Sequence, residues 1–178
     1  MYEFEIKFRI ENLPQFLENC QKLGIEFGNE KNQIDGVWIA KDADGTNLVS
    51  GMPVVRTREE GEKKLVTLKI ELKHGTFEEH ETTIGSIKEI EDIVGNLGMR
   101  KLVEINKTRK NAQYKNYNLC LDNVKNLGDF IEIEVVSKDY DDNAKEKILE
   151  LSKVFGLTDK DVVVNTYNTL LCRKYNLK

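Results

Sequence analysis

Charged and apolar side chains alternate along much of this chain. In the opening stretch the charged positions are Glu3, Glu5 and Lys7, and the positions between them are Phe4, Ile6 and Phe8. Because successive side chains of a β-strand point to opposite faces, this spacing predicts a strand with one charged and one apolar face. Further strands are predicted over residues 33–40, 53–59, 65–73, 78–84, 101–110, 114–123 and 129–136. A tight turn at His74-Gly75 favours antiparallel pairing.

Four helices are predicted from helical spacing of apolar residues and from capping signals. The first follows Asn12 and ends at Gly24, and the second begins with the capping box Ser86-Ile87-Lys88-Glu89 and runs to Gly98. The remaining two cover residues 142–155 and 165–175. No repeat, low-complexity stretch or linker divides the chain, so we expect a single domain over residues 1–178.

The arrangement of the charged faces predicts how the strands assemble. Most of the predicted strands have an apolar face opposite their charged face, and the amphipathic helices need an apolar surface to pack on. We therefore expect an α+β fold in which eight antiparallel strands close into a barrel, with helices packed outside and charged side chains inside. One irregularity is that Lys107 and Arg109 fall on the same face as Val103 and Ile105, so this strand needs a bulge or a change of environment along its length.

A charged lumen is not a core, because burying unpaired charge costs several kcal/mol per ion. Basic side chains on several walls suit a polyanion such as a chain of phosphates, and carboxylates suit hard divalent cations. Together they predict a metal–triphosphate site. The alternative is that these are solvated strand faces, which is the commoner origin of any one such motif.

Composition narrows the class of protein. Charged residues make up 33% of the chain, yet the net charge is only −4, which argues against a nucleic-acid binder. No apolar run could span a bilayer and no leader pattern opens the chain, so we expect a cytoplasmic protein without a membrane partner. The three cysteines and two histidines lack disulfide or zinc spacing and are expected to be packing and surface residues.

These motifs together resemble the CYTH superfamily, also called triphosphate tunnel metalloenzymes. The resemblance rests on Glu3-x-Glu5-x-Lys7, Arg56-Thr57-Arg58, Thr67-Leu68-Lys69, Glu79-His80-Glu81, Lys107-Thr108-Arg109, Leu121-Asp122 and the stretch from Leu127 to Glu134. The layout is most similar to CyaB-type class IV adenylyl cyclases, with Thr166-Tyr167 where these have a Ser-Tyr pair. Residues 33–38 depart from the usual Asp-x-Tyr-Phe of the second strand.

The resemblance implies a tunnel that holds a triphosphate and Mg²⁺ or Mn²⁺. The implied metal ligands are Glu3, Glu5, Glu132, Glu134 and Asp122. The implied substrate-binding residues are Lys7, Arg56, Arg58, Lys69, Lys107, Arg109, Glu79 and Glu81. Glu3, Glu5, Lys7 and Asp122 are the implied catalytic residues.

Two reactions fit these residues equally. The first expectation is an adenylyl cyclase that converts ATP to cyclic AMP and pyrophosphate, and the alternative is hydrolysis of tripolyphosphate, a nucleotide or thiamine triphosphate. Val54 stands where animal thiamine triphosphatases carry a tryptophan. Trp38, the one tryptophan, either stacks on a base at the tunnel mouth or, as we favour, packs against a helix. A non-catalytic binding module is less favoured, since no predicted metal carboxylate is missing. The sequence leaves open whether the protein forms a homodimer.

Overall fold

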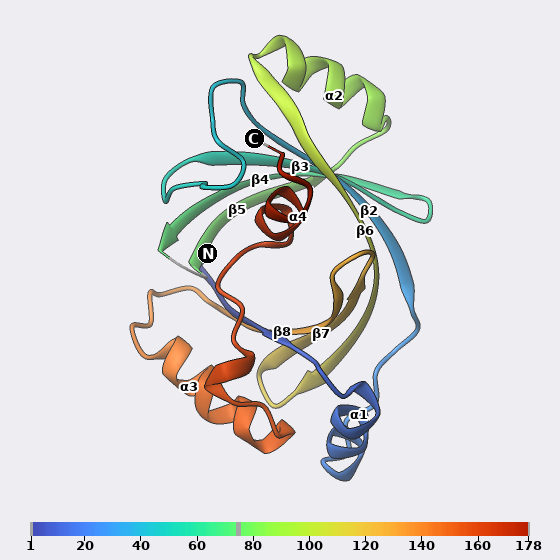
Figure 1. The fold of residues 1–178 in the computed structure, drawn as a ribbon, viewed down its shortest axis with the longest axis vertical. Coiled ribbons are helices and arrows are strands. Elements are labelled where there is room, and N and C mark those ends of the chain that lie inside the picture. The colour runs from blue at the N-terminus through green and yellow to red at the C-terminus, as the bar shows by residue number, and fades with distance from the viewer. Residues whose placement is uncertain (1, 74–75, 178) are drawn as a thin grey trace.

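The computed structural model describes residues 2–73 and 76–177, in which eight strands form a closed barrel (Figure 1). They are β1 (Tyr2–Arg9), β2 (Lys31–Ala40), β3 (Pro53–Glu60), β4 (Lys63–Lys73), β5 (Thr76–Thr83), β6 (Met99–Tyr114), β7 (Tyr117–Val124) and β8 (Gly128–Ser137). Their order around the barrel is β1-β5-β4-β3-β2-β6-β7-β8, and neighbouring strands pair antiparallel. The predicted fold class is confirmed. The predicted turn at His74-Gly75 lies outside the described residues.

Strand β6 is longer than its pattern predicted and continues to Tyr114. The prediction assigned Tyr114 to the following strand, which was wrong, because the chain reverses just after it. Lys115 has a positive φ of 56°, the left-handed conformation that tight hairpin turns require. Tyr114 and Tyr117 then pair across the turn.

The α-helices in the described part of the chain are α1 (Leu13–Lys22), α2 (Ile87–Asn96), α3 (Ala144–Ser152) and α4 (Tyr167–Tyr175). Two short 3₁₀ helices, η1 (Lys153–Phe155) and η2 (Asp159–Asp161), follow α3. As predicted, Asn12 and Ser86 cap α1 and α2 by accepting hydrogen bonds from Gln15 N and Glu89 N. Gly156, with a φ of 81°, ends the helical segment that contains α3 and η1. None of these helices combines the length and apolar character needed to cross a bilayer.

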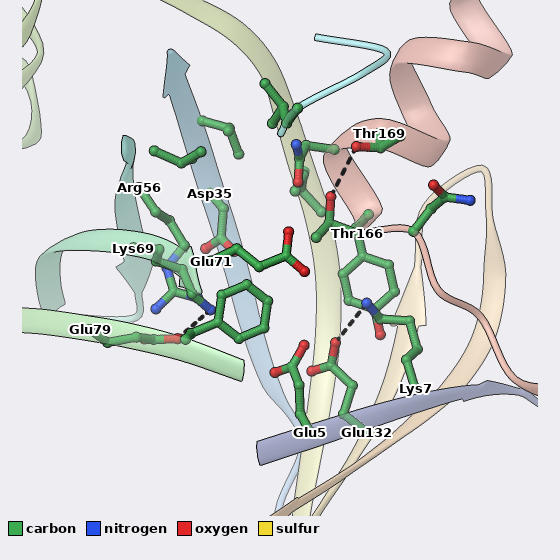
Figure 2. Close-up of a pocket in the computed structure, with 18 of the residues that line it drawn as sticks. Glu5, Lys7, Asp35, Arg56, Lys69, Glu71, Glu79, Glu132, Thr166 and Thr169 are labelled. Carbon is green, nitrogen blue, oxygen red and sulfur yellow. Dashed lines mark hydrogen bonds and ion pairs between the residues drawn. The ribbon is translucent and has the colours of Figure 1, made fainter. Parts of the chain in front are cut away.

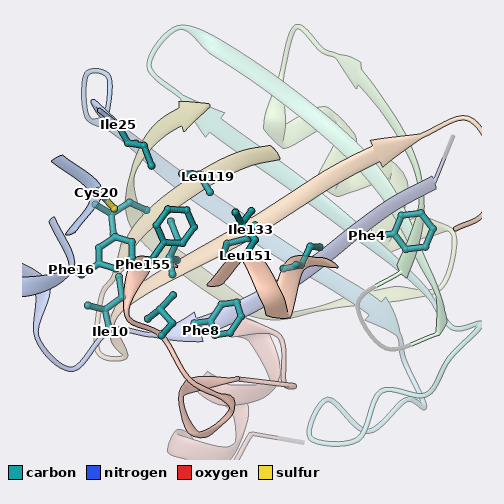
Figure 3. Packing of buried hydrophobic residues seen from close by; sticks show 14 of the residues in the cluster. Phe4, Phe8, Ile10, Phe16, Cys20, Ile25, Leu119, Ile133, Leu151 and Phe155 are labelled. Carbon is teal, nitrogen blue, oxygen red and sulfur yellow. The ribbon is translucent and has the colours of Figure 1, made fainter. Parts of the chain in front are cut away.

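The main apolar core lies outside the barrel, between the outer faces of β1, β7 and β8 and the segments α1, α3 and η1 (Figure 3). Phe4 and Phe8 of β1 are 1% and 0% exposed and pack in this core. Burying an aromatic or branched aliphatic side chain contributes about 1.5–3 kcal/mol. This packing fixes the orientation of β1 and turns its charged face inward.

Helix α4 departs from the expectation that every helix lies outside the barrel. Its residues Tyr167 and Leu171 pack against Val37, Ile105 and Phe130, whose side chains share the inward parity of the charged positions on β2, β6 and β8. Figure 1 shows α4 within the ring of strands. The barrel interior therefore has a charged region and an apolar region, and α4 covers the apolar one.

This division explains the irregular pattern of β6. Arg109, Lys107 and Ile105 all line the interior, so the environment changes along the strand as anticipated. A bulge is also present, between Val37 and Trp38 of β2 where it pairs with β6. Trp38 lies beside Gly95 of α2, where an added Cβ would come within 3.8 Å of its ring, which supports the predicted packing role.

Candidate active site

The barrel encloses a cavity of about 600 Å³ with walls contributed by β1–β6 and β8, and by the first turn of α4. All the site residues predicted from the sequence line this cavity except Asp122, which lies behind its wall. The sequence did not single out several further residues that line it, namely Asp35, Glu71, Asn168 and Thr169, and it named Thr166 and Tyr167, which also line it, only as a terminal pair. Figure 2 shows how side chains from β1, β4 and β8 converge on this space.

Three carboxylates come together on the wall formed by β1 and β8. One oxygen each of Glu3, Glu5 and Glu134 lies within 4.8 Å of the others. Glu5 and Glu134 are direct partners in the β1–β8 register, whereas Glu3 lies two residues along β1. An all-oxygen donor set of this kind fits a hard divalent cation such as Mg²⁺ or Mn²⁺.

The electrostatics of this cluster also fit a cation. Burial and the charge of Glu132 raise the pKa of Glu134 to about 8. Burial, with the charge of Glu79, raises the pKa of Glu3 to about 7, and burial with Glu132 raises the pKa of Glu5. Protons therefore compete for these oxygens, and a divalent ion would neutralise the same crowded charge.

Glu132 lies apart from this cluster, although the sequence grouped it with the metal ligands. Its carboxylate forms an ion pair with Lys7 Nζ at 3.2 Å and accepts a hydrogen bond from Arg109 (Figure 2 shows the pair with Lys7). Burial alone would raise the pKa of Glu132, but Lys7, Arg109 and Lys107 hold it well below its ordinary value. Its contacts are with cations, and its predicted metal role stays a prediction.

Asp122 is fully buried among cations. Its Oδ1 accepts from Arg109 Nε at 2.6 Å, and its Oδ2 accepts from Arg109 Nη2 at 2.5 Å, Lys107 Nζ at 2.8 Å and the Tyr167 hydroxyl at 3.1 Å. A carboxylate offers about four acceptor positions, so these four bonds use its capacity. The geometry favours an orienting role for Asp122 over the metal and catalytic roles predicted from the sequence.

The predicted phosphate-binding cations come from four strands, β1, β3, β4 and β6. Arg58 is held by Asp35 of β2, whose Oδ1 and Oδ2 accept from its Nε and Nη2 at 2.6 and 2.7 Å. Burial would raise the pKa of Asp35, but Arg58 outweighs it and lowers that pKa. Sequence reasoning missed Asp35, although its place on an inward-facing position of β2 was a usable signal.

Glu79 and Glu81 pair with cations of the same set. Lys69 Nζ lies 2.5 Å from Glu79 Oε1, and Arg56 Nη2 lies 3.3 Å from Glu81 Oε2. Figure 2 marks the pair of Lys69 and Glu79 with a dashed line. Burial alone would lower the pKa of Lys69. The charges of Glu5, Glu79 and Glu3 outweigh burial, so the pKa of Lys69 is raised. These two glutamates accordingly lie beside the predicted substrate-binding cations and outside the three-carboxylate cluster.

The aromatic ring of Tyr167 contacts two of the cations, Lys7 and Lys107. The ammonium groups of Lys7 and Lys107 lie 4.1 and 5.1 Å from its ring centroid, within the range of cation–π contacts. Burial, with the charge of Arg109, lowers the pKa of Lys107 to about 8. The sequence placed Tyr167 only in a terminal pair of residues similar to that of the family, and its position inside the barrel was not predicted.

The fold is a closed eight-stranded barrel whose interior carries both carboxylates and basic side chains. The chain belongs to the CYTH domain family, whose model matches residues 1–167. The resemblance found in the sequence is thereby confirmed.

Individual relatives are similar over nearly their whole length. A Methanocaldococcus jannaschii protein named "Putative adenylate cyclase" is 27% identical over 172 residues, which cover 94% of this chain and 97% of that protein. A conserved hypothetical protein from Pyrococcus furiosus has a similar structure, with a TM-score of 0.81, 31% identity, and coverage of 94% of this chain and 99% of that chain. A Hippeastrum protein, described as a "Putative adenylyl cyclase" that reveals a dominant triphosphatase activity, shares the fold with a TM-score of 0.62 and 17% identity, covering 99% of this chain and 96% of that one.

Proposed function

We propose that this protein is a divalent-metal-dependent enzyme that acts on a triphosphate inside its barrel. CYTH proteins are typically enzymes that act on triphosphates such as ATP, and the family implies a divalent metal. One observation carries the proposal for this chain: the cluster of Glu3, Glu5 and Glu134 shares one cavity inside the barrel with cations from four strands.

In this proposal the carboxylates and the basic side chains of the barrel have different roles. Glu3, Glu5 and Glu134 would hold the metal, which when bound supplies charge neutralisation and activation of an oxygen nucleophile. Arg56, Arg58, Lys69, Lys107 and Arg109 would grip the phosphate oxygens, arginine through its planar fork and lysine as a point charge. Because phosphoryl transfer depends on positioning and charge stabilisation, pairs such as Asp35–Arg58 preorganise these groups.

The reaction we favour is adenylyl cyclisation, in which the ribose 3′-hydroxyl oxygen attacks the α-phosphorus of ATP and pyrophosphate leaves. The name of the Methanocaldococcus jannaschii relative, similar along the full chain, supports this choice. The second candidate is a triphosphatase, which would use the same residues with water as nucleophile. The activity named for the Hippeastrum protein of the same fold supports that candidate.

Product analysis separates the candidates. The protein is incubated with ATP, tripolyphosphate or thiamine triphosphate in the presence of Mg²⁺ or Mn²⁺, and cyclic AMP, pyrophosphate and inorganic phosphate are quantified. Cyclic AMP and pyrophosphate in equal amounts would indicate a cyclase, and inorganic phosphate a hydrolase. Tight binding without turnover of any of them would refute the enzymatic proposal in favour of a binding module. A cytoplasmic location and a homodimeric state stay predictions.

A further inference from the structure

The cavity opens to solvent beside a rim of apolar side chains. Leu48, Val49 and Met52 of the loop between β2 and β3 line it, and so does Val164, just before α4. Val49 is 54% exposed and Val164 is 65% exposed, so these lining residues mark the mouth of the cavity. A bare chain of phosphates has no apolar surface to place against them, whereas apolar walls are typical of pockets for organic ligands.

Glu71 brings a carboxylate to this end of the cavity. It lies two residues beyond Lys69 on the inward face of β4, is partly exposed, and lines the cavity. Its backbone oxygen accepts hydrogen bonds from Gly51 N at 2.7 Å and Ser50 Oγ at 2.8 Å, which tie this end of β4 to the apolar loop. Figure 2 shows the side chain reaching from β4 into the cavity. Glu71 therefore stands between the apolar rim and Lys69, a predicted phosphate-binding cation.

The surroundings of this carboxylate suit a different part of the ligand from the phosphates. Among the described residues, the cluster that could hold a metal consists of Glu3, Glu5 and Glu134 and does not include Glu71. A carboxylate only accepts hydrogen bonds, and it repels a phosphate placed against it. Phe77, the partner of Glu71 in the β4–β5 register, is a further apolar lining residue. A flat ring that carries an N–H donor fits both the carboxylate and these apolar surroundings.

We propose that Glu71 is a specificity-determining residue that selects triphosphates whose organic part is a nitrogen heterocycle with an exocyclic amino group. The amino group donates a hydrogen bond to the Glu71 carboxylate, the ring packs against the apolar rim, and the phosphates extend to the basic residues. Adenine and the pyrimidine ring of thiamine both carry such an amino group. This inference rests on the proposed function for the phosphate part of the ligand, and it adds the residue that reads the organic part.

Binding is measured by calorimetry with Mn²⁺, using ligands in which methylene groups replace both bridging oxygens of the triphosphate, so that none is turned over. Two pairs of organic ligands are compared: the analogues of ATP and thiamine triphosphate, each with its counterpart that lacks only the amino group. The tripolyphosphate analogue is the fifth ligand. We expect wild-type protein to prefer the amino ligand about 5–10-fold within a pair, and the pair that shows this preference identifies the organic group.

Two substitutions of Glu71 test the origin of this preference. Glu71→Leu removes the acceptor and should abolish the preference, whereas Glu71→Gln keeps an acceptor oxygen and should retain most of it. Both variants should bind the tripolyphosphate analogue at least as tightly as wild type, because each removes a negative charge from the cavity. A purely structural role would instead change the affinity for all ligands in the same direction.

Two controls address the rim and the surface. Val164→Ser, at the apolar rim, should weaken the amino ligand and its counterpart alike, by about 3-fold, and leave the tripolyphosphate analogue unchanged. Glu62→Leu, in the exposed β3–β4 turn, should bind every ligand as wild type does.

Equal affinities within both pairs in wild-type protein would overturn the inference, and so would a preference that persists in Glu71→Leu. A similar loss of all ligands in Glu71→Leu, the tripolyphosphate analogue included, would reduce Glu71 to a structural residue and overturn it as well. Wild-type protein that binds none of the ligands would refute the proposed function together with this inference. Binding with the expected preference but no turnover of the unmodified triphosphates would refute only the enzymatic proposal.

Discussion

Replacing Glu134 with glutamine should stabilise the metal-free protein while removing its response to divalent cations. Glu134 lies with Glu3 and Glu5 in a cluster whose oxygens are within 4.8 Å of one another. Glutamine keeps the size of the side chain and removes one of the three negative charges. The same change removes a ligand that the proposed metal needs, so the two effects have opposite signs.

The magnitude follows from the pKa of Glu134, which burial and Glu132 raise from 4.5 to about 8. Between these values the folded protein retains a proton that the unfolded chain has released, so stability falls as pH rises through this window. A pKa change of this size corresponds to an upper limit of about 5 kcal/mol. Because the neighbouring carboxylates share protons, we expect the variant to gain about 1–3 kcal/mol at about pH 8.

Among the described residues, no other carboxylate of the site with a shifted pKa opposes the effect of Glu134 in this window, and Glu5, whose pKa burial and Glu132 raise, acts in the same direction. Asp35 and Glu132 have lowered pKa values, so they are ionised in both the folded and the unfolded states above about pH 5. Lys107, with a pKa of about 8, affects the slope only above that pH. Glu3, whose pKa is raised to about 7, contributes in the same direction as Glu134.

The assay is chemical denaturation at about pH 5.5 and about pH 8, with a chelator or with Mn²⁺. Wild-type protein should be less stable at the higher pH in chelator and should recover with Mn²⁺. Glu134→Gln should lose less stability than wild type when the pH is raised, should not be stabilised by Mn²⁺, and should show no turnover. Glu62→Gln, in the exposed β3–β4 turn, should behave as wild type. A Glu134→Gln variant that keeps its stabilisation by Mn²⁺, or that matches wild type in chelator at about pH 8, would refute the reasoning.

Three further predictions test the walls of the barrel. Arg58→Lys should raise KM for the triphosphate several-fold in steady-state kinetics, and Arg58→Ala should also lower kcat. The control Lys147→Ala, on the exposed side of α3, should change either constant little. Equally small effects of the Arg58 and Lys147 substitutions would mean that Arg58 does not bind substrate. Tyr167→Phe removes the 3.1 Å hydrogen bond to Asp122 but keeps the ring, so unfolding experiments should show a loss of about 1–2 kcal/mol, and an unchanged stability would contradict it. Gly36→Ala would bring a methyl group within 2.6 Å of a buried threonine hydroxyl of β3, so its Tm should fall by several degrees, and an unchanged Tm would show that the outer face has room.

The inward and outward faces of the strands were predictable from the sequence. Alternation with a period of two is a local property of extended backbone, so Glu3, Glu5 and Lys7 had to share one face and Phe4 and Phe8 the other. Once that apolar face packs under helices, the charged face turns inward, and the structure has this arrangement. The same argument placed the basic residues of β3 and β4 in the lumen, whereas on β6 it also required a change of environment along the strand.

The partners of those inward charges depend on register and closure, which join residues far apart in the chain. Glu132 and Glu134 occupy equivalent positions in the pattern of β8, yet one meets Lys7 and Arg109 and the other meets Glu3 and Glu5. Strand pairing decides this difference, and the local period carries no information on it.

Tertiary structure alone also decided the place of α4 and of the residues that it brings to the cavity. An amphipathic helix signals that it must cover an apolar surface, but its sequence does not say on which side of a sheet that surface lies. Val37, Ile105 and Phe130 form such a surface inside the barrel only after β2, β6 and β8 have closed around it. Helix α4 packs on that surface, which places Tyr167 beneath the cations and Asn168 in the cavity wall.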